Sequence, residues 1–163
     1  MQNCDLEDYI SNSHHYRGWI INEFSKLEKE IELFIMDDLE ILMICGFEFQ
    51  TIILDRMTFE AKRASLKKLL EEKSKKNGFK KTSKNSYPHK RLLEELVALN
   101  EIRNNFAHFP LNETFLNDEY LYNAICLIKY RDDYRTVNYT HSQIETIITR
   151  IHKSIDDIKR LKS

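Results

Sequence analysis

Glycine and proline are almost absent from this sequence. Only three glycines and two prolines occur among its 163 residues. An all-β sandwich or barrel needs turn residues roughly every 8–12 positions, and this chain does not supply them. The scarcity favours long helices, and it excludes collagen-like chains and chains disordered by Pro and Gly. The length suits one domain spanning residues 1–163.

Apolar residues recur at helical spacing in several segments. The first stripe contains Ile20, Phe24, Leu27, Ile31 and Phe34. We expect it to continue through Ile41 and Leu42 to a stop at Gly46. Residues 49–57 are apolar and predicted helical, and Thr58 resembles an N-cap for a further helix to about Ser74.

Two more stripes lie in the second half of the chain. One follows Pro88 and ends at Pro110, since the residue before a proline avoids the helical region. Its buried face comprises Leu92, Leu93, Leu96, Leu99, Ile102 and Phe106. Thr140 and Gln143 form a capping-box pattern that opens the last helix. The stripe of that helix comprises Ile144, Ile148, Ile151, Ile155 and Ile158.

Residues 123–140 favour strand, with a turn at Asp132 and Asp133. A β-hairpin is the preferred interpretation here, and an extended helix from Leu116 to Lys129 is the alternative. The predicted fold is therefore mainly α. It is an up-and-down bundle of four to five helices with a small β-hairpin before the last helix.

The net charge of −1 hides a strong asymmetry along the chain. Residues 1–60 hold 13 acids and 4 bases, whereas residues 61–91 hold 2 acids and 12 bases. A basic loop over residues 75–87 is predicted between two helices. It can bind the phosphates of RNA, or it can be a solvated loop that pairs with the acidic N-terminal helix. The candidate RNA-binding residues are Lys75, Lys76, Lys80, Lys81 and Lys84.

Other features restrict the compartment and the chemistry. Three cysteines without close spacing argue against a disulfide framework or a zinc knuckle. The apolar run at residues 41–47 is too short to span a membrane, and the polar N-terminus predicts no secretory signal. We therefore expect a cytoplasmic protein with no membrane contact, metal or cofactor. His14 and His15 are expected at a solvated helix start, and Trp19 in the core or at a dimer interface.

The residues best suited to catalysis lie at the end of the helix before Pro110. Asn100, Asn104 and His108 are each four residues apart, so they share one helical face, and Arg103 flanks it. This trio of amide, guanidinium and imidazole suits RNA cleavage. The histidine would accept the proton of a ribose 2′-hydroxyl, and the arginine would stabilise the charged phosphate.

An ordinary helix end is the alternative interpretation. Asparagine is common near a helix C-terminus, and histidine interacts favourably with the helix dipole there. The spacing of Arg and His is weakly specific, because Arg135 and His141 also match it. That second pair spans the predicted hairpin and a helix start, so it lacks a shared helical frame.

The segment from Arg103 to His108 resembles the signature of HEPN domains, in which a polar residue follows the arginine and a histidine comes a few positions later. The segments at residues 18–28 and 59–70 resemble the first and second helices of that family. The resemblance covers most of the chain from about Tyr16 onward, although only the motif is specific. It implies that Arg103 and His108 are the catalytic pair and Asn104 their polar neighbour.

The resemblance also implies a biological setting. Many HEPN proteins are metal-independent endoribonucleases of toxin–antitoxin, abortive-infection and phage-defence systems. They dimerise, with two copies of the motif facing a cleft, so a homodimer, RNA and an antitoxin or defence partner are the expected partners. Pro110 stands where one subgroup carries a tyrosine that its nucleotidyltransferase antitoxin modifies, so that route of neutralisation is not expected. A non-catalytic HEPN-like binding module and a nucleic-acid-binding regulator using the Lys-rich loop are the alternatives.

Overall fold

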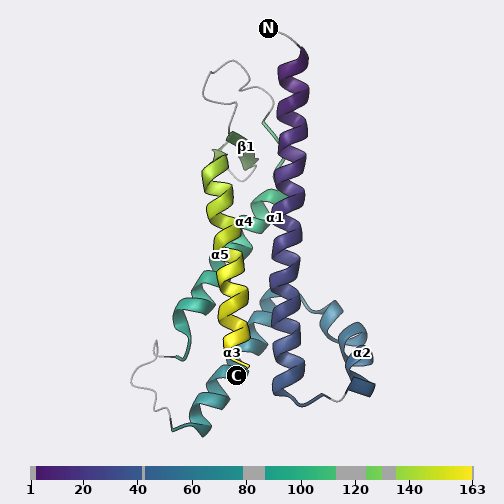
Figure 1. Cartoon of the computed structure of the whole chain (residues 1–163), viewed down its shortest axis with the longest axis vertical. Coiled ribbons are helices and arrows are strands. Elements are labelled where there is room, and N and C mark those ends of the chain that lie inside the picture. The colour runs from purple at the N-terminus through teal and green to yellow at the C-terminus, as the bar shows by residue number, and fades with distance from the viewer. Residues whose placement is uncertain (1–2, 42, 79–86, 113–123, 130–134, 163) are drawn as a thin grey trace. The chain divides into compact units, whose positions relative to one another are not determined.

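The computed structural model describes residues 3–41, 43–78, 87–112, 124–129 and 135–162. These ranges contain five α-helices, one 3-10 turn and two antiparallel strands (Figure 1). In chain order they are α1 (Asn3–Asp38), α2 (Met43–Ile52), η1 (Leu54–Arg56), α3 (Phe59–Lys76), α4 (Lys90–His108), β1 (Ala124–Lys129), β2 (Arg135–Thr140) and α5 (His141–Arg160). The predicted helical fold with a β-hairpin before the last helix is confirmed.

The chain forms two compact units. The first contains Met1–Phe24 and Leu99–Ile151, and the second contains Ser25–Ala98 and His152–Ser163. The long helices α1, α4 and α5 each contribute residues to both units. That residues 1–163 are one domain stays a prediction.

The end of α1 differs from the prediction. The helix ends at Asp38, and Gly46 lies inside α2 rather than at a stop. The amide of Ile41 donates to the carbonyl of Met36, and the amide of Glu40 donates to that of Asp37. With Glu40 at a φ of +52°, these two bonds form a Schellman motif. Because the left-handed residue is a glutamate rather than a glycine, the sequence carried no signal for this end.

The apolar stripes and the caps follow the sequence closely. All five residues of the first stripe are at most 1% exposed, and Leu93, Leu96, Leu99 and Phe106 are buried on α4. On α4, Leu92 and Ile102 are only partly buried. The Thr58 side chain accepts from the amide of Ala61, as predicted for an N-cap. The Thr140 amide donates to Gln143, and the Gln143 amide donates to the Thr140 hydroxyl, which confirms the capping box.

Unit 1 contains the hairpin and the segment that follows α4. Strands β1 and β2 pair antiparallel with Leu127 opposite Val137, so the alternative helix over residues 116–129 is wrong for residues 124–129. The amide of Ile128 donates to the carbonyl of Pro110, and Leu111 bridges Leu127. The chain after α4 is therefore paired to β1, which fixes the direction in which it leaves the helix.

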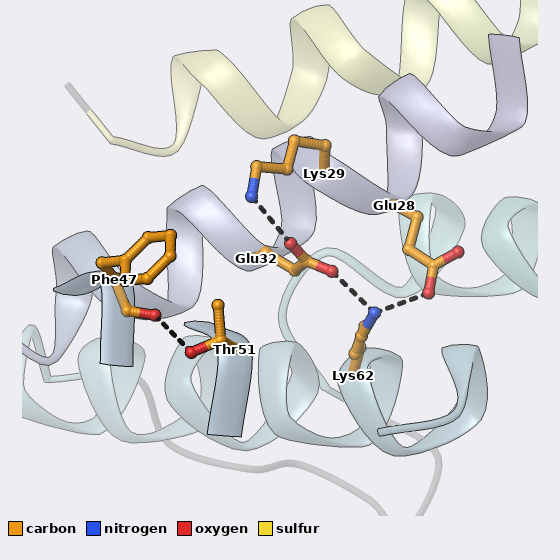
Figure 2. A network of polar contacts seen from close by, with 6 residues as sticks. All are labelled: Glu28, Lys29, Glu32, Phe47, Thr51 and Lys62. Atoms are coloured by element: carbon orange, nitrogen blue, oxygen red, sulfur yellow. Dashed lines mark hydrogen bonds and ion pairs between the residues drawn. The ribbon is translucent and has the colours of Figure 1, made fainter. Parts of the chain in front are cut away.

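Unit 2 contains a buried lysine between α1 and α3. Lys62 is 4% exposed, and its ammonium group lies 2.7 Å from Glu28 and 2.6 Å from Glu32 (Figure 2). Lys29 also contacts Glu32, at 3.1 Å. Burial alone would lower the pKa of Lys62, but the hydrogen bonds and charges of the two glutamates outweigh it, so the pKa is raised. This network holds α3 against α1 within the unit.

Glu40→Gly should raise the free energy of unfolding by about 1 kcal/mol, because the left-handed conformation strains a residue that has a Cβ atom. Urea unfolding followed by circular dichroism measures the change. Ala64→Gly, at an exposed position inside α3, should instead lower it by about 1 kcal/mol. Destabilisation by both substitutions would contradict the proposed helix end.

Lys62→Met should lower the free energy of unfolding by about 2–4 kcal/mol near neutral pH, because it leaves two carboxylates without their shared cation. The matched control is Lys68→Met in an exposed pair with Glu72, which should leave the free energy of unfolding nearly unchanged.

The difference in the free energy of unfolding between wild type and Lys62→Met should depend on pH in a defined direction. The raised pKa of Lys62 means that its contribution is fully present below the unfolded-state pKa of about 10.4. It is lost as the pH rises through the folded-state pKa. The stability difference between wild type and Lys62→Met should therefore shrink in alkaline buffer, and a difference that grows there would exclude the raised pKa.

Candidate functional site

The predicted catalytic residues lie in the last two turns of α4. The helix ends at His108, and the amide of Phe109 still donates to the carbonyl of Asn105. Pro110 then prevents continuation of the helix, as predicted. The sequence thus placed the motif correctly at a helix C-terminus.

Arg103 is partly buried and oriented by two neighbours. Its Nη1 atom donates a hydrogen bond of 3.0 Å to Oδ1 of Asn104. Its Cζ atom lies 5.8 Å from the centre of the Phe24 ring, which is a cation–π arrangement. A guanidinium carries five N–H donors in a planar fork. Holding one edge of that fork therefore fixes the direction of the others, which suits a phosphate-binding role.

His108 is exposed in the final helical turn. An imidazole in this position can exchange protons with solvent and can approach a bound substrate. The histidine is accessible, and the contacts of Arg103 described above are with an amide oxygen and an aromatic ring rather than with a carboxylate.

Asn105, the residue between these groups, ties the motif to the hairpin. Its Nδ2 atom donates to the Tyr139 hydroxyl at 3.0 Å, and the Tyr139 ring packs 4.7 Å from that of Phe106. Burial raises the pKa of Tyr139, the negative charge of Glu101 adds to the rise, and the hydrogen bond from Asn105 opposes it. Tyr139 therefore stays a neutral phenol at neutral pH and can hold the Asn105 amide.

Arg17 is a second anchor, and the sequence analysis missed it. Its Nη2 atom donates to the carbonyl of Phe109 at 2.7 Å, one residue after His108. Burial lowers the pKa of Arg17, while the charge of Tyr9 raises it. A signal was present in the sequence: Arg17 lies on the same helical stripe as Ile20 and Phe24, where a cation needs a polar partner.

A further hydrogen-bonded chain joins α1 to α5 in the same unit. The Tyr16 hydroxyl lies 2.7 Å from Nδ1 of His141, and Nε2 of His141 lies 3.0 Å from Glu145. In the sequence, His141 stands out only through its weaker Arg–His match with Arg135. Arg135 begins β2, whereas His141 begins α5, so the two do not share an element.

The predicted RNA-binding lysines are only partly described. Lys75 and Lys76 are exposed in the last turn of α3, in unit 2, while Lys80, Lys81 and Lys84 lie outside the described residues. Lys75 contacts Glu72 at 2.9 Å. Hydrogen bonds from Lys68 and Lys75 lower the pKa of Glu72 to about 2, so its negative charge persists across the neutral range.

In the ranges that the structure describes, no group of three or more His, Cys, Asp or Glu residues is arranged to hold a metal ion. None of the helices in those ranges is long and apolar enough to span a membrane. Comparison with models of protein families, with curated proteins and with solved structures gives no match.

Arg17→Met should lower the free energy of unfolding by about 1–2 kcal/mol, because the carbonyl of Phe109 loses its charged donor. The loosened helix end should also accelerate hydrogen exchange of the Phe109 amide, which bonds to Asn105. The control is Arg160→Met, whose side chain is 78% exposed and paired with Asp157, and it should change neither quantity measurably. Unchanged exchange at Phe109 in Arg17→Met would show that Arg17 does not anchor the helix end.

Proposed function

We propose that this protein is an endoribonuclease of the HEPN type, which cleaves RNA without a metal ion. The supporting observation is the end of α4, where an exposed His108 stands five residues, or about 1.4 helical turns, after an Arg103 oriented by Asn104. The motif resemblance supplies the reaction type, and the local geometry is compatible with it. A toxin or phage-defence role, with an antitoxin or defence partner, is part of the same proposal.

The proposed reaction uses the substrate's own nucleophile. His108 accepts the proton of a ribose 2′-hydroxyl, and the 2′-oxygen attacks the adjacent phosphorus. Arg103 stabilises the charge that develops on the phosphate oxygens. The bond between phosphorus and the 5′-oxygen breaks, this oxygen takes up a proton from the solvent, and His108 returns the proton it accepted to the solvent. The products are a 2′,3′-cyclic phosphate and a free 5′-hydroxyl.

Asn104 acts on the arginine rather than on the substrate in this proposal. Its Oδ1 atom accepts from Nη1 of Arg103, so it fixes the guanidinium plane before RNA binds. Preorganised donors stabilise developing charge better than donors that must reorient during the reaction. Asn104 is therefore a positioning residue for Arg103.

A non-catalytic binding module is the second candidate. It is supported by the same hydrogen bond, because an arginine held by its neighbouring amide can simply complete a helix end. A nucleic-acid-binding regulator is supported by the exposed Lys75 and Lys76 in the basic segment. Both alternatives predict RNA or protein binding without any cleavage.

The test is cleavage of single-stranded RNA in buffer containing EDTA. His108→Ala should lower kcat by about 100- to 10,000-fold, because the general base is lost. Arg103→Ala should lower it by about 100- to 1,000-fold, because the phosphate charge is no longer stabilised. Asn104→Ala should have a smaller effect. The cleaved ends should carry the cyclic phosphate and the 5′-hydroxyl.

The matched controls are His152→Ala and Arg160→Ala, which remove an exposed imidazole and an exposed guanidinium from α5. Both should retain wild-type activity. Cleavage that persists in Arg103→Ala and His108→Ala alike would reject the site. RNA binding with a steep salt dependence and no cleavage would favour the regulator.

A further inference from the structure

Helix α2 in unit 2 is apolar but buries none of its described side chains (Figure 1). Its sequence from Met43 to Ile52 contains a single charged residue, Glu48. Over residues 45–52, where the structure describes the side chains, every residue is exposed or only partly buried. A helix with so few polar groups is ordinarily buried, because its apolar surface is more stable out of water. The folded chain therefore leaves α2 available to a partner.

Three large apolar side chains of this segment are strongly exposed. Phe47 is 73% exposed, Ile52 57% and Ile53 45%, and we call these three residues the α2 surface. The amide of Ile53 still donates to the carbonyl of Phe49, so all three project from one continuous helical segment. Single exposed apolar residues are common in proteins, whereas a cluster of them is typical of an interaction site.

Negative charge accompanies the α2 surface along the chain. Residues 33–56 hold five acids and one base. Asp37, Glu40, Glu48 and Asp55 are all exposed. Charges around an interface select partners by complementarity, since opposite charges attract and like charges that are forced together are costly. The acidic surroundings therefore suit a partner that carries Lys or Arg beside its own apolar side chains.

A second copy of the chain complements this surface poorly. In a twofold contact, the α2 surface of one copy would face that of the other, which brings the same carboxylates towards one another. In a head-to-tail contact, the basic residues 61–91 would supply the cations. However, the described residues of that range include no exposed large apolar side chain that could pack on Phe47. Neither arrangement matches both the apolar and the acidic character of the surface.

Anionic occupants are disfavoured by the same charge. Helices that lie on membranes carry Lys and Arg beside their apolar side chains, which attract anionic lipids. Surfaces that bind RNA use the same two residue types to neutralise phosphates. Arg56 is the one basic residue within 33–56. The occupant that fits must therefore combine an apolar face with positive charge.

We propose that the α2 surface binds a basic amphipathic helix of a partner protein. The apolar face of such a helix packs on the α2 surface, as the apolar faces of helices pack on one another and in grooves. Its Lys and Arg side chains lay their aliphatic stems over the apolar contact while their charged ends reach Glu48 and Asp55. The proposal does not rest on the endoribonuclease, because α2 belongs to unit 2 and the α4 motif to unit 1.

The test uses peptides of known chemistry. A labelled peptide of Leu and Lys, with a leucine at every third or fourth position, should bind the full chain in a titration followed by fluorescence anisotropy. A Leu/Glu peptide of the same pattern should bind about tenfold more weakly or less, and so should a Leu/Lys peptide of the same composition in scrambled order. Equal binding by either control peptide, or no binding by the first, would overturn the proposal.

The label is placed on the peptide because the only tryptophan of the chain, Trp19, lies on α1 in unit 1 rather than on α2. Of the two places expected for Trp19, the core is wrong, because its side chain is only partly buried. Its place at a dimer interface stays a prediction.

Substitutions on α2 locate the contact. Phe47→Ser should weaken binding of the Leu/Lys peptide by about tenfold or more, because the most exposed ring can no longer be buried by the peptide, and Ile52→Ser is a second test of the same kind. Glu48→Lys should weaken it as well, since it reverses a charge of the rim. The matched controls Val97→Ser and Glu94→Lys change an exposed apolar residue and an exposed acid of α4 within unit 2, and both should bind as wild type does. Circular dichroism should be unchanged in these variants, and wild-type affinity in both Phe47→Ser and Ile52→Ser would overturn the proposal.

The other occupants give different results with the same proteins. A wild-type dimer that Phe47→Ser dissociates in sedimentation would assign the surface to a second copy and overturn the proposal. Vesicles of phosphatidylcholine and phosphatidylglycerol that bind wild type but not Phe47→Ser would assign it to a membrane and also overturn the proposal. Peptide binding by a protein without ribonuclease activity would reject the proposed function and retain this surface, and cleavage without peptide binding would do the reverse.

Discussion

The site depends on how the end of α4 is held. The last carbonyl groups of a helix have no partner within the helix, and here Arg17 reaches from α1 to the carbonyl of Phe109. The next residue, Pro110, accepts from Ile128 of β1, and Asn105 is bonded to Tyr139 of β2. Three elements of unit 1 thus fix the backbone around His108 while its ring stays exposed. A rigid support beneath an accessible imidazole would suit the acid–base role proposed for His108.

Features that depend on neighbouring residues were predictable from the sequence. The stripes on α1, α4 and α5, the Thr58 cap and the capping box at Thr140 each involve residues within one or two helical turns. For the same reason, the position of Arg103, Asn104 and His108 at one helix end could be predicted from the nearby Pro110. The prediction that the first helix ends at Gly46 was wrong because it also used only local sequence. A helix end is expected at a glycine, since glycine readily adopts the left-handed conformation, but here Glu40 adopts it.

Features that join distant segments were not predictable. Tyr16 and His141 are 125 residues apart in the sequence, and Arg17 and Phe109 are 92 apart. Periodicity identifies the face on which a residue lies, but it does not identify the partner opposite. A charged residue on an apolar helix face is the exception, because it indicates that a polar partner must lie opposite. Lys62 on the buried face of α3 had to find partners, because an unpaired buried cation is strongly unfavourable. Arg17 is only partly buried, but it too lies among apolar neighbours and has a carbonyl partner.

The motif geometry bears on how one copy of the chain could act. Arg103 and His108 are five residues apart, which on a helix corresponds to about 140° of rotation and about 7.5 Å of rise. Asn104, which accepts a hydrogen bond from the Arg103 guanidinium, lies on the same face as His108. The side chains of Arg103 and His108 themselves leave the helix in different directions. In the proposed reaction, convergence on one phosphodiester would therefore need the reach of the arginine side chain or a second copy of the helix, as in the paired arrangement that the HEPN resemblance would imply.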